Sequence, residues 1–472
     1  MKTESPRGRR PLVAVLVGTM VGLAPLLAAI GGLGGLQSRN NGENKNAVAV
    51  SPNALLSVRR LNETLARDVA VNSLRRDLKD YVSSIGNGSC LSVRAGERTV
   101  VERNGTVKLI PASNTKILTA LVALDVLGAD HRFTTKIVGE VVDGVATGNL
   151  YIVGGGDPVL SLPNYPGTEQ YPTLFFTDVT SLLNGVASAG VRRVEGSLVG
   201  DGTLFDEQRF PSGWSDDIRY VYGGPIGALL LDDGTVFGLG QKPDDPAYAA
   251  SQELSARLRN LGISVIGSAA MGKAPPDSPV VASIESAPLS DIVTEMLTNS
   301  DNNTAEMLLK SIGLASKGVA STAAGAQVVM DKLIEWGFST DGLTMNDGSG
   351  LDRSNQLTCD LLVGLLETPE GHDLAKRMAI GGTTGTLVDA FTEPPAYGVV
   401  RAKTGSLTGV KALSGFASDA VGAPVFSLIF NGSGVNNSSY FRPRWTELLS
   451  LLYGYPQAPS ADKLDLQVAT DK

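Results

Sequence analysis

The stretch that decides the fold is PASNTKILTALVALDVLG, which spans Pro111–Gly128. A proline precedes a serine, a long apolar run follows, and Gly128 supplies a stop signal, so we expect a helix that begins near Ser113. Ser113 and Lys116 are three positions apart, which places a hydroxyl and an amine on one face of that helix. Free backbone N–H groups at a helix start favour developing negative charge. The stretch therefore predicts a serine nucleophile with a lysine as its base.

This pair is a weak signal by itself. Ser-x-x-Lys also occurs at Ser460–Lys463, and a serine at a helix start is often only an N-cap. A lysine acts as a base when it is neutral, and burial beside other cations lowers its pKa. The chain has only two histidines, His131 and His372, which we expect to be surface or loop residues. A Ser-His-Asp triad is therefore disfavoured relative to a serine–lysine pair.

A second candidate motif, Ser300-Asp301-Asn302, lies between two stretches with helical periodicity. The Ser300 hydroxyl could relay a proton between the lysine and a leaving group, and the Asn302 amide could hold a peptide backbone. The alternative is a serine that caps a helix or stands in a turn. Ser-x-Asn recurs elsewhere in the chain, so this motif also needs support from others.

The third candidate motif lies in RAKTGSLTG, Arg401–Gly409, which reads as a strand. Lys403 and Thr404 could bind a carboxylate through charge-assisted hydrogen bonds. Gly405 would let a substrate run along the strand edge, and the N–H of Ser406 could join that of Ser113 in an oxyanion hole. The alternative is an ordinary edge strand with a lysine that discourages aggregation.

Composition excludes several classes of function. The 472 residues carry a net charge of -8, which argues against nucleic acid as a partner because phosphate binding needs a basic face. Hydrophobic residues make up 42% and charged residues 19%, as in a globular chain long enough for several domains. No phosphate-binding loop or zinc-ligand cluster is present in the sequence, so we expect no metal and no cofactor.

The amino terminus predicts export. A basic segment, residues 1–10, precedes an uncharged run at 11–36 that is long enough to span a bilayer, and the positive-inside rule places the rest of the chain outside the cytoplasm. We expect a membrane anchor; the alternative is a signal cleaved near Leu27–Ala29, which would release the protein. The two cysteines, Cys90 and Cys359, are compatible with one disulfide or with two buried thiols.

Patterning divides the chain further. Helical spacing at 54–82, a hairpin with the turn AGER and the helix at Ser113 form one region, and long helices and strands return after residue 289. Between them, strand-like runs such as LYIVGG, VEGSLVGDG and GTVFGLG predict an inserted β-rich unit. The expected segments after the anchor are a linker at 37–53, a first part of one domain at 54–130, the insertion at 131–288, the second part at 289–456 and a loose tail at 457–472.

The three motifs occur in the order Ser-x-x-Lys, Ser-Asp-Asn and Lys-Thr-Gly, each in a matching local setting. Together with GGGDPVLS, GDGTLFD, NDGSGLDRSNQLT and GGTTGTL, they make the chain resemble the low-molecular-mass class C penicillin-binding proteins, the D-alanyl-D-alanine carboxypeptidase/endopeptidase family. The long gap between Lys116 and Ser300 matches that family, which inserts domains there. The resemblance implies a multi-domain α/β (α+β) fold in which a penicillin-binding, β-lactamase-like transpeptidase domain, an antiparallel sheet flanked by helices, is interrupted by the insertion.

The resemblance also implies a mechanism and its residues. Ser113 would attack the carbonyl between two D-alanines of a peptidoglycan stem peptide, Lys116 would be its base, and β-lactams would acylate the same serine. The other implied roles are proton transfer by Ser300, peptide binding by Asn302, carboxylate binding by Lys403, Thr404, Gly405 and Ser406, and contacts of Asp157 and Arg353 with the charged end of a stem side chain. For Asp157 and Arg353 the alternatives are a turn aspartate and a surface arginine.

The sequence departs from the family pattern at two charges. Asp389 follows GGTTGTL where a basic residue is common, and Lys411 adds a cation on the strand after Lys-Thr-Gly. Two alternative functions stay open: an esterase or β-lactamase of the same fold, which the long insertion disfavours, and a non-catalytic cell-wall-binding relative, which would not need all three motifs.

Overall fold

The computed structural model describes residues 58–236, 242–420 and 422–455, all within the compact unit Val58–Lys472. The predicted basic segment, membrane span, linker and tail lie outside these residues. Among the helices that are described, none is both apolar enough and long enough to cross a membrane.

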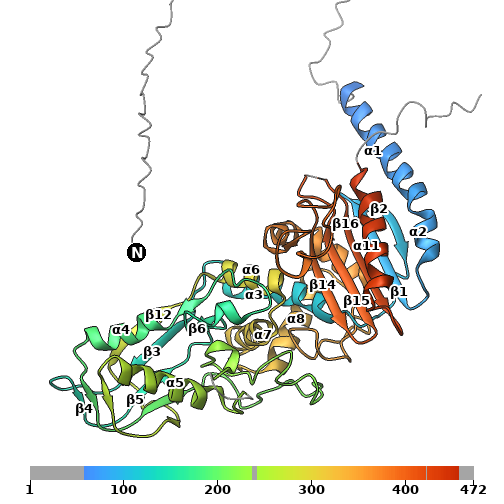
Figure 1. The fold of residues 1–472 in the computed structure, drawn as a ribbon. Helices are drawn as coiled ribbons and strands as arrows, with labels where there is room; N and C mark the ends of the chain where they lie inside the picture. Colours follow the sequence, from blue (N-terminus) through green and yellow to red (C-terminus); the bar gives the residue numbers. More distant parts are fainter. Residues whose placement is uncertain (1–57, 237–241, 421, 456–472) are drawn as a thin grey trace, which may run out of the picture. The chain divides into compact units, whose positions relative to one another are not determined.

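A six-stranded sheet organises the part of the chain that carries the three motifs (Figure 1). All its pairings are antiparallel, as the resemblance implies, and β1 joins the start of the described chain to β16 near its end. In spatial order the strands are β13 (Ala379–Ile380), β14 (Arg401–Leu407), β15 (Val410–Phe416), β16 (Val425–Asn431), β1 (Ser89–Ala95) and β2 (Arg98–Arg103).

Helices cover both faces of this sheet, because the strands are apolar on both faces. On β15 and β16, Ala412 and Ile429 belong to one buried cluster and Leu413 and Leu428 to another, which is the two-residue alternation of a strand. The first cluster packs on α3 (Thr115–Leu127), α6 (Leu289–Asn299), α7 (Asn302–Lys317), α8 (Thr322–Glu335), α9 (Cys359–Leu366) and α10 (Pro369–Leu374), and the second on α1 (Val58–Asp77), α2 (Lys79–Ser84) and α11 (Ser438–Tyr453).

Helix α3 is the central helix of the first layer. Residues Thr115–Ala123 are all buried, and the helix ends at Gly128, whose φ of 89° suits glycine. The predicted helix is confirmed, although its regular part begins two residues after Ser113. Ser113 itself stands in a short 3₁₀ turn, Ala112–Asn114, that leads into α3.

Residues 131–288 form two further main sheets, each combined with helices (Figure 1). The five-stranded sheet has the order β11-β9-β5-β3-β12 and the three-stranded sheet the order β10-β8-β4, while α4 (Thr180–Ser188) and α5 (Pro246–Asn260) pack in the same core. The strand predicted for GTVFGLG is not formed at residues 234–236, which belong to no strand. The structure does not describe residues 237–241. The strands are β3 (Thr134–Val138), β4 (Val145–Ala146), β5 (Leu150–Val153), β8 (Arg193–Val194), β9 (Leu198–Asp201), β10 (Ser264–Val265), β11 (Ala270–Met271) and β12 (Val280–Glu285), with β6 (Leu160–Ser161) and β7 (Thr177–Asp178) as a separate pair.

Cys90 and Cys359 form a disulfide, one of the two alternatives that the sequence left open. The bond joins β1 to the first residue of α9 across 269 positions, and both side chains are buried. It therefore ties the chain before the insertion to the chain after it.

Reduction of this disulfide should lower the free energy of unfolding by about 2–5 kcal/mol, because the unfolded chain regains the freedom that the long closed loop removes. Urea unfolding with and without a thiol reductant measures the effect. In the double variant Cys90→Ala/Cys359→Ala the reductant should not move the unfolding midpoint. An equal midpoint for the wild-type protein under both conditions would contradict the prediction.

Candidate active site

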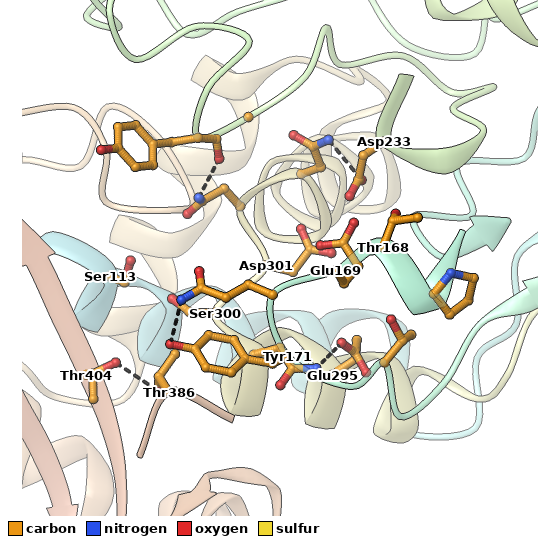
Figure 2. Close-up of a pocket in the computed structure, with 18 of the residues that line it drawn as sticks. Ser113, Thr168, Glu169, Tyr171, Asp233, Glu295, Ser300, Asp301, Thr386 and Thr404 are labelled. Atoms are coloured by element: carbon orange, nitrogen blue, oxygen red, sulfur yellow. Dashed lines mark hydrogen bonds between the residues drawn. The ribbon is translucent and has the colours of Figure 1, made fainter. Parts of the chain in front are cut away.

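The three motifs meet at one place in the fold. Ser113 comes from the turn before α3, Ser300 from the junction of α6 and α7, and Thr404 from β14, and Figure 2 shows all three around one cavity. Lys116 Nζ lies 3.2 Å from Ser113 Oγ, and Lys403 Nζ lies 2.8 Å from Ser300 Oγ. The predicted convergence of the motifs is therefore what the structure shows.

The Lys116 amine is positioned as a base. Its side chain is fully buried, and Nζ donates hydrogen bonds to Asn302 Oδ1 and to the Ser349 carbonyl oxygen, each at 2.7 Å. A neutral amine has two N–H donors and one lone pair, so these two bonds leave the lone pair for the Ser113 hydroxyl. Burial lowers the pKa of Lys116 to about 8, since the charged form loses its hydration.

Two buried carboxyl groups hold the turn that contains Ser349, whose carbonyl oxygen accepts a hydrogen bond from Lys116. Sequence reasoning did not find either group. Glu306 on α7 accepts hydrogen bonds from the N–H groups of Gly348 and Ser349, at 3.0 and 2.8 Å. Asp347 accepts one from Gly350 N at 2.8 Å and another from the Asn355 side chain. Both acids oppose the fall in the Lys116 pKa, and burial raises the pKa of Glu306 to about 8. Acidic residues in helix interiors and Gly-rich turns are common, so their patterns carried no specific signal.

Ser300 occupies a strained position between two helices. Its φ of 67° is left-handed, and it ends α6, while the next residue, Asp301, caps α7 by accepting a hydrogen bond from Thr304 N. Only Ser300 and Asp301 separate the two helices, and Ser300 lines the cavity at this junction. The conformation costs on the order of 1 kcal/mol, which surrounding packing must offset.

The Lys403 side chain does not point into the cavity lining, where we expected it to bind a carboxylate directly. It is fully buried, donates to Ser300 Oγ and to the Thr404 carbonyl oxygen, and does not line the cavity. Burial first, and then Lys116 and Lys411, lowers its pKa well below the usual value. Thr404 and Ser406 do line the cavity, and Thr404 Oγ1 lies 2.9 Å from Thr386 Oγ1 (Figure 2).

Strand β14 presents a partly open edge at the cavity. The short strand β13 pairs only with Arg401 and Ala402, so Lys403–Leu407 have no strand on that side among the described residues. An extended peptide can add to such an edge. Gly405 also has a packing role that was not expected: a Cβ there would lie 2.7 Å from the Pro111 carbonyl oxygen. The glycine lets the Ser113 turn pack directly on the strand.

The insertion contributes directly to the site. The Tyr222 carbonyl oxygen accepts a hydrogen bond from Asn302 Nδ2 at 2.6 Å, and Trp214 Nε1 donates to Asp347 at 2.8 Å. Asn303, next to Asn302, donates to Asp233 at 2.9 Å (Figure 2). The insertion therefore fixes the Asn302 amide, which leaves its oxygen for Lys116.

A cavity of about 750 Å³ lies over the three motifs. A loop of the insertion forms one wall, and Figure 2 shows its Tyr171 directed toward Thr386. Five acidic side chains line the insertion side of the cavity: Glu169, Asp232, Asp233, Glu295 and Asp301. Burial, and then the charge of Asp233, raises the pKa of Asp301 to about 8.

The two residues that the resemblance placed against a stem side chain, Asp157 and Arg353, do not line this cavity. Asp157 is buried and accepts a hydrogen bond from Val159 N at 3.0 Å, and burial raises its pKa to about 6. Arg353 is exposed and donates to the Thr408 carbonyl oxygen at 2.8 Å, in the turn after β14. Both positions agree with the alternatives that the sequence offered, a turn aspartate and a surface arginine. The histidines also lie outside the cavity lining, and no group of acidic, histidine or cysteine side chains among the described residues is arranged to hold a metal ion.

Comparison with known proteins identifies the family. The family model described as D-Ala-D-Ala carboxypeptidase 3 (S13) matches residues 86–239 and 237–448. The D-alanyl-D-alanine carboxypeptidase of Actinomadura sp. (strain R39) is 31% identical over 415 residues, which cover 70% of this chain and 74% of that protein. A carboxypeptidase of Mycobacterium tuberculosis is 30% identical over 350 residues, covering 71% and 74% of the two chains.

The chain belongs to the D-Ala-D-Ala carboxypeptidase 3 (S13) family. It is accordingly a serine-type peptidase, a hydrolase of D-alanyl-D-alanine peptides. The fold agrees: penicillin binding protein 4 of Haemophilus influenzae superposes with a TM-score of 0.67 at 23% identity, over 80% of this chain and 98% of that one. The resemblance and the fold class inferred from the motifs are thus confirmed.

The pKa of Lys116 predicts how acylation of this family member depends on pH. If Lys116 is the base that takes the Ser113 proton, it must be neutral to do so, and the acylation rate constant for penicillin should rise from about pH 6 to about pH 8 and then stop rising. Stopped-flow measurement of acylation across this range, with circular dichroism to verify the fold, tests this. A rate constant that does not change with pH would show that Lys116 is not the titrating base.

Proposed function

We propose that Ser113 is the nucleophile of a D-alanyl-D-alanine carboxypeptidase reaction that proceeds through an acyl-enzyme. The observation that carries the proposal is the contact of a fully buried Lys116 amine, whose two other hydrogen bonds are occupied, with the Ser113 hydroxyl. A non-catalytic wall-binding protein has no need for this arrangement, because removing an amine from water costs free energy that its hydrogen bonds must offset.

In the proposed reaction Lys116 takes the proton of Ser113 as Oγ attacks the carbonyl between two D-alanines. The Ser300 hydroxyl then relays this proton from Lys116 to the leaving amine, giving its own proton and regaining one from Lys116, while Lys403 holds that hydroxyl in place. Asn302 holds the peptide through its amide, and the N–H groups of Ser113 and Ser406 stabilise the oxyanion. Water finally hydrolyses the acyl-enzyme.

The substrate carboxylate would bind at Thr404 and Ser406, which face the cavity, while the peptide backbone runs along the open edge of β14. Lys403 would hold this subsite in place by donating hydrogen bonds to Ser300 Oγ and to the Thr404 carbonyl oxygen. Asp157 and Arg353 would act on the stem side chain only indirectly, since neither lines the cavity.

We further propose that the substrates are peptidoglycan stem peptides, that cross-links are cleaved as well, and that β-lactams acylate Ser113. Among structures of this fold are the Haemophilus influenzae protein complexed with a β-lactam and a peptidoglycan endopeptidase of Bdellovibrio bacteriovorus, at TM-scores of 0.59 and 0.51 and identities of 23% and 19%. They cover 80% and 78% of this chain, and 97% and 94% of their own. An esterase or β-lactamase activity is the alternative.

Such substrates lie outside the cytoplasm, and a buried disulfide suits an oxidising compartment. We propose that residues 11–36 anchor the protein to the membrane or act as a cleaved signal. We also propose that residues 54–130 and 289–456 form one penicillin-binding domain, which residues 131–288 interrupt.

Labelled penicillin tests the acyl-enzyme. The wild-type protein should take up one covalent label, and Ser113→Ala should take up none, because the label needs the Ser113 oxygen. The control is Ser460→Ala, which removes the other Ser-x-x-Lys serine and should keep the label. Mass spectrometry of the intact proteins gives the result; a folded wild-type protein without label would refute the proposal.

Thr404→Val tests the carboxylate subsite. Loss of one hydrogen bond to a charged group should lower kcat/KM for a peptide ending in free D-Ala-D-Ala about tenfold, but not for the peptide with an amidated end. Thr408→Val, on the turn beyond the cavity lining, is the matched control. An equal loss on both peptides would assign Thr404 a structural role instead.

A further inference from the structure

The wall of the cavity on the sheet side carries two cations that form no salt bridge. Lys411 on β15 and Arg442 on α11 both line the cavity, and neither forms a salt bridge with any carboxylate of the described residues. Arg442 donates to the backbone carbonyl oxygen of Asp389. We call Ser406, Lys411, Phe441, Arg442 and Trp445 the cationic compartment.

Two aromatic rings hold the Lys411 amine in the compartment. Nζ lies 4.2 Å from the centre of the Phe441 ring and 5.3 Å from that of Trp445, both on α11. Cation–π contact supports a charged ammonium where water is partly excluded, without neutralising it. Burial and Arg442 lower the pKa of Lys411 to about 8, which agrees with the lack of a negative partner.

The compartment lies beside the proposed carboxylate subsite. Lys411 is the direct cross-strand partner of Ser406, and opposed residues of an antiparallel pair project from the same face. A substrate whose terminal carboxylate binds Thr404 and Ser406 would therefore place its last residue next to Lys411. Most acidic side chains of the cavity come from the insertion, from α6 or from the junction before α7: Glu169, Asp232, Asp233, Glu295 and Asp301. Asp389 also lines the cavity, but it forms no salt bridge with Lys411 or Arg442.

We propose that the cationic compartment binds a second carboxylate, carried by the side chain of the leaving residue. The proposal rests on the proposed function, since it takes the α-carboxylate to lie at Thr404 and Ser406. Bound there, the second carboxylate accepts a charge-assisted hydrogen bond from Lys411, whose ammonium has no acidic partner in the free protein. The protein thus selects leaving residues with an acidic side chain over neutral ones of the same shape.

Two acylated peptides that end in D-Ala-D-Glu and D-Ala-D-Gln, and are otherwise identical, isolate this charge. The quantity measured is the ratio of their kcat/KM values, from release of the last residue. We expect the wild-type protein to favour D-Glu about tenfold, Lys411→Met to bring the ratio close to one, and Lys411→Arg to restore the preference. Lys242→Met, which removes another cavity lysine on the insertion side, should keep the wild-type ratio.

Equal rates for the two peptides with the wild-type protein, or the same ratio in Lys411→Met, would overturn the proposal. The wild-type measurement stands even if Lys411→Met does not fold. Failure of the proposed function gives a different result: the wild-type protein would release no residue from any D-Ala-D-Xaa peptide and would take up no penicillin.

Discussion

The arrangement of the site depends on the burial of the Lys116 amine. The Lys116 side chain is inaccessible to solvent, and its hydrogen bonds to Asn302 and Ser349 use the donors of a neutral amine. The lone pair is then available to the Ser113 hydroxyl, which the short turn before α3 presents to the cavity. A base of this kind depends on dehydration, so every element that excludes water from Lys116 contributes to the chemistry.

Several contacts bring distant parts of the chain together around this amine. The turn at 347–350 supplies the Ser349 carbonyl oxygen, and Glu306 and Asp347 hold that turn by its N–H groups. Gly405 allows the Ser113 turn to contact β14. The disulfide joins β1 to α9 within the same layered core. The sheet, the helices and the turns that surround Lys116 and Ser113 thus come from both halves of the chain.

Charge is distributed unevenly across the cavity. Acidic groups gather where the insertion meets α6 and α7, whereas Lys411 and Arg442 stand on the side of the sheet and α11. Burial first, and then the neighbouring Lys116 and Lys411, lowers the pKa of Lys403. The insertion is therefore part of the site: its Tyr222 carbonyl orients Asn302, and its Trp214 bonds Asp347. From the sequence we had expected only Asp157 of the insertion at the site.

The sequence by itself determined the elements that carry the motifs, because their signals are local. The apolar run after Ser113 predicted α3, the alternation around Lys-Thr-Gly predicted β14 and β15, and the two helical patterns predicted the junction at Ser300. The order of the motifs, through the family resemblance, predicted that they meet.

Tertiary structure alone decided how each side chain is used. It turned Lys403 toward Ser300, gave Gly405 a packing role, left Asp157 and Arg353 outside the cavity lining and paired the two cysteines. It also gave Glu306 a role that no local pattern indicated, and it placed Lys411, which the sequence had marked only as an added charge, at the cavity wall. The physical reason is that burial, hydrogen-bond partners and pKa depend on groups brought in from distant positions, and no short window of sequence contains them.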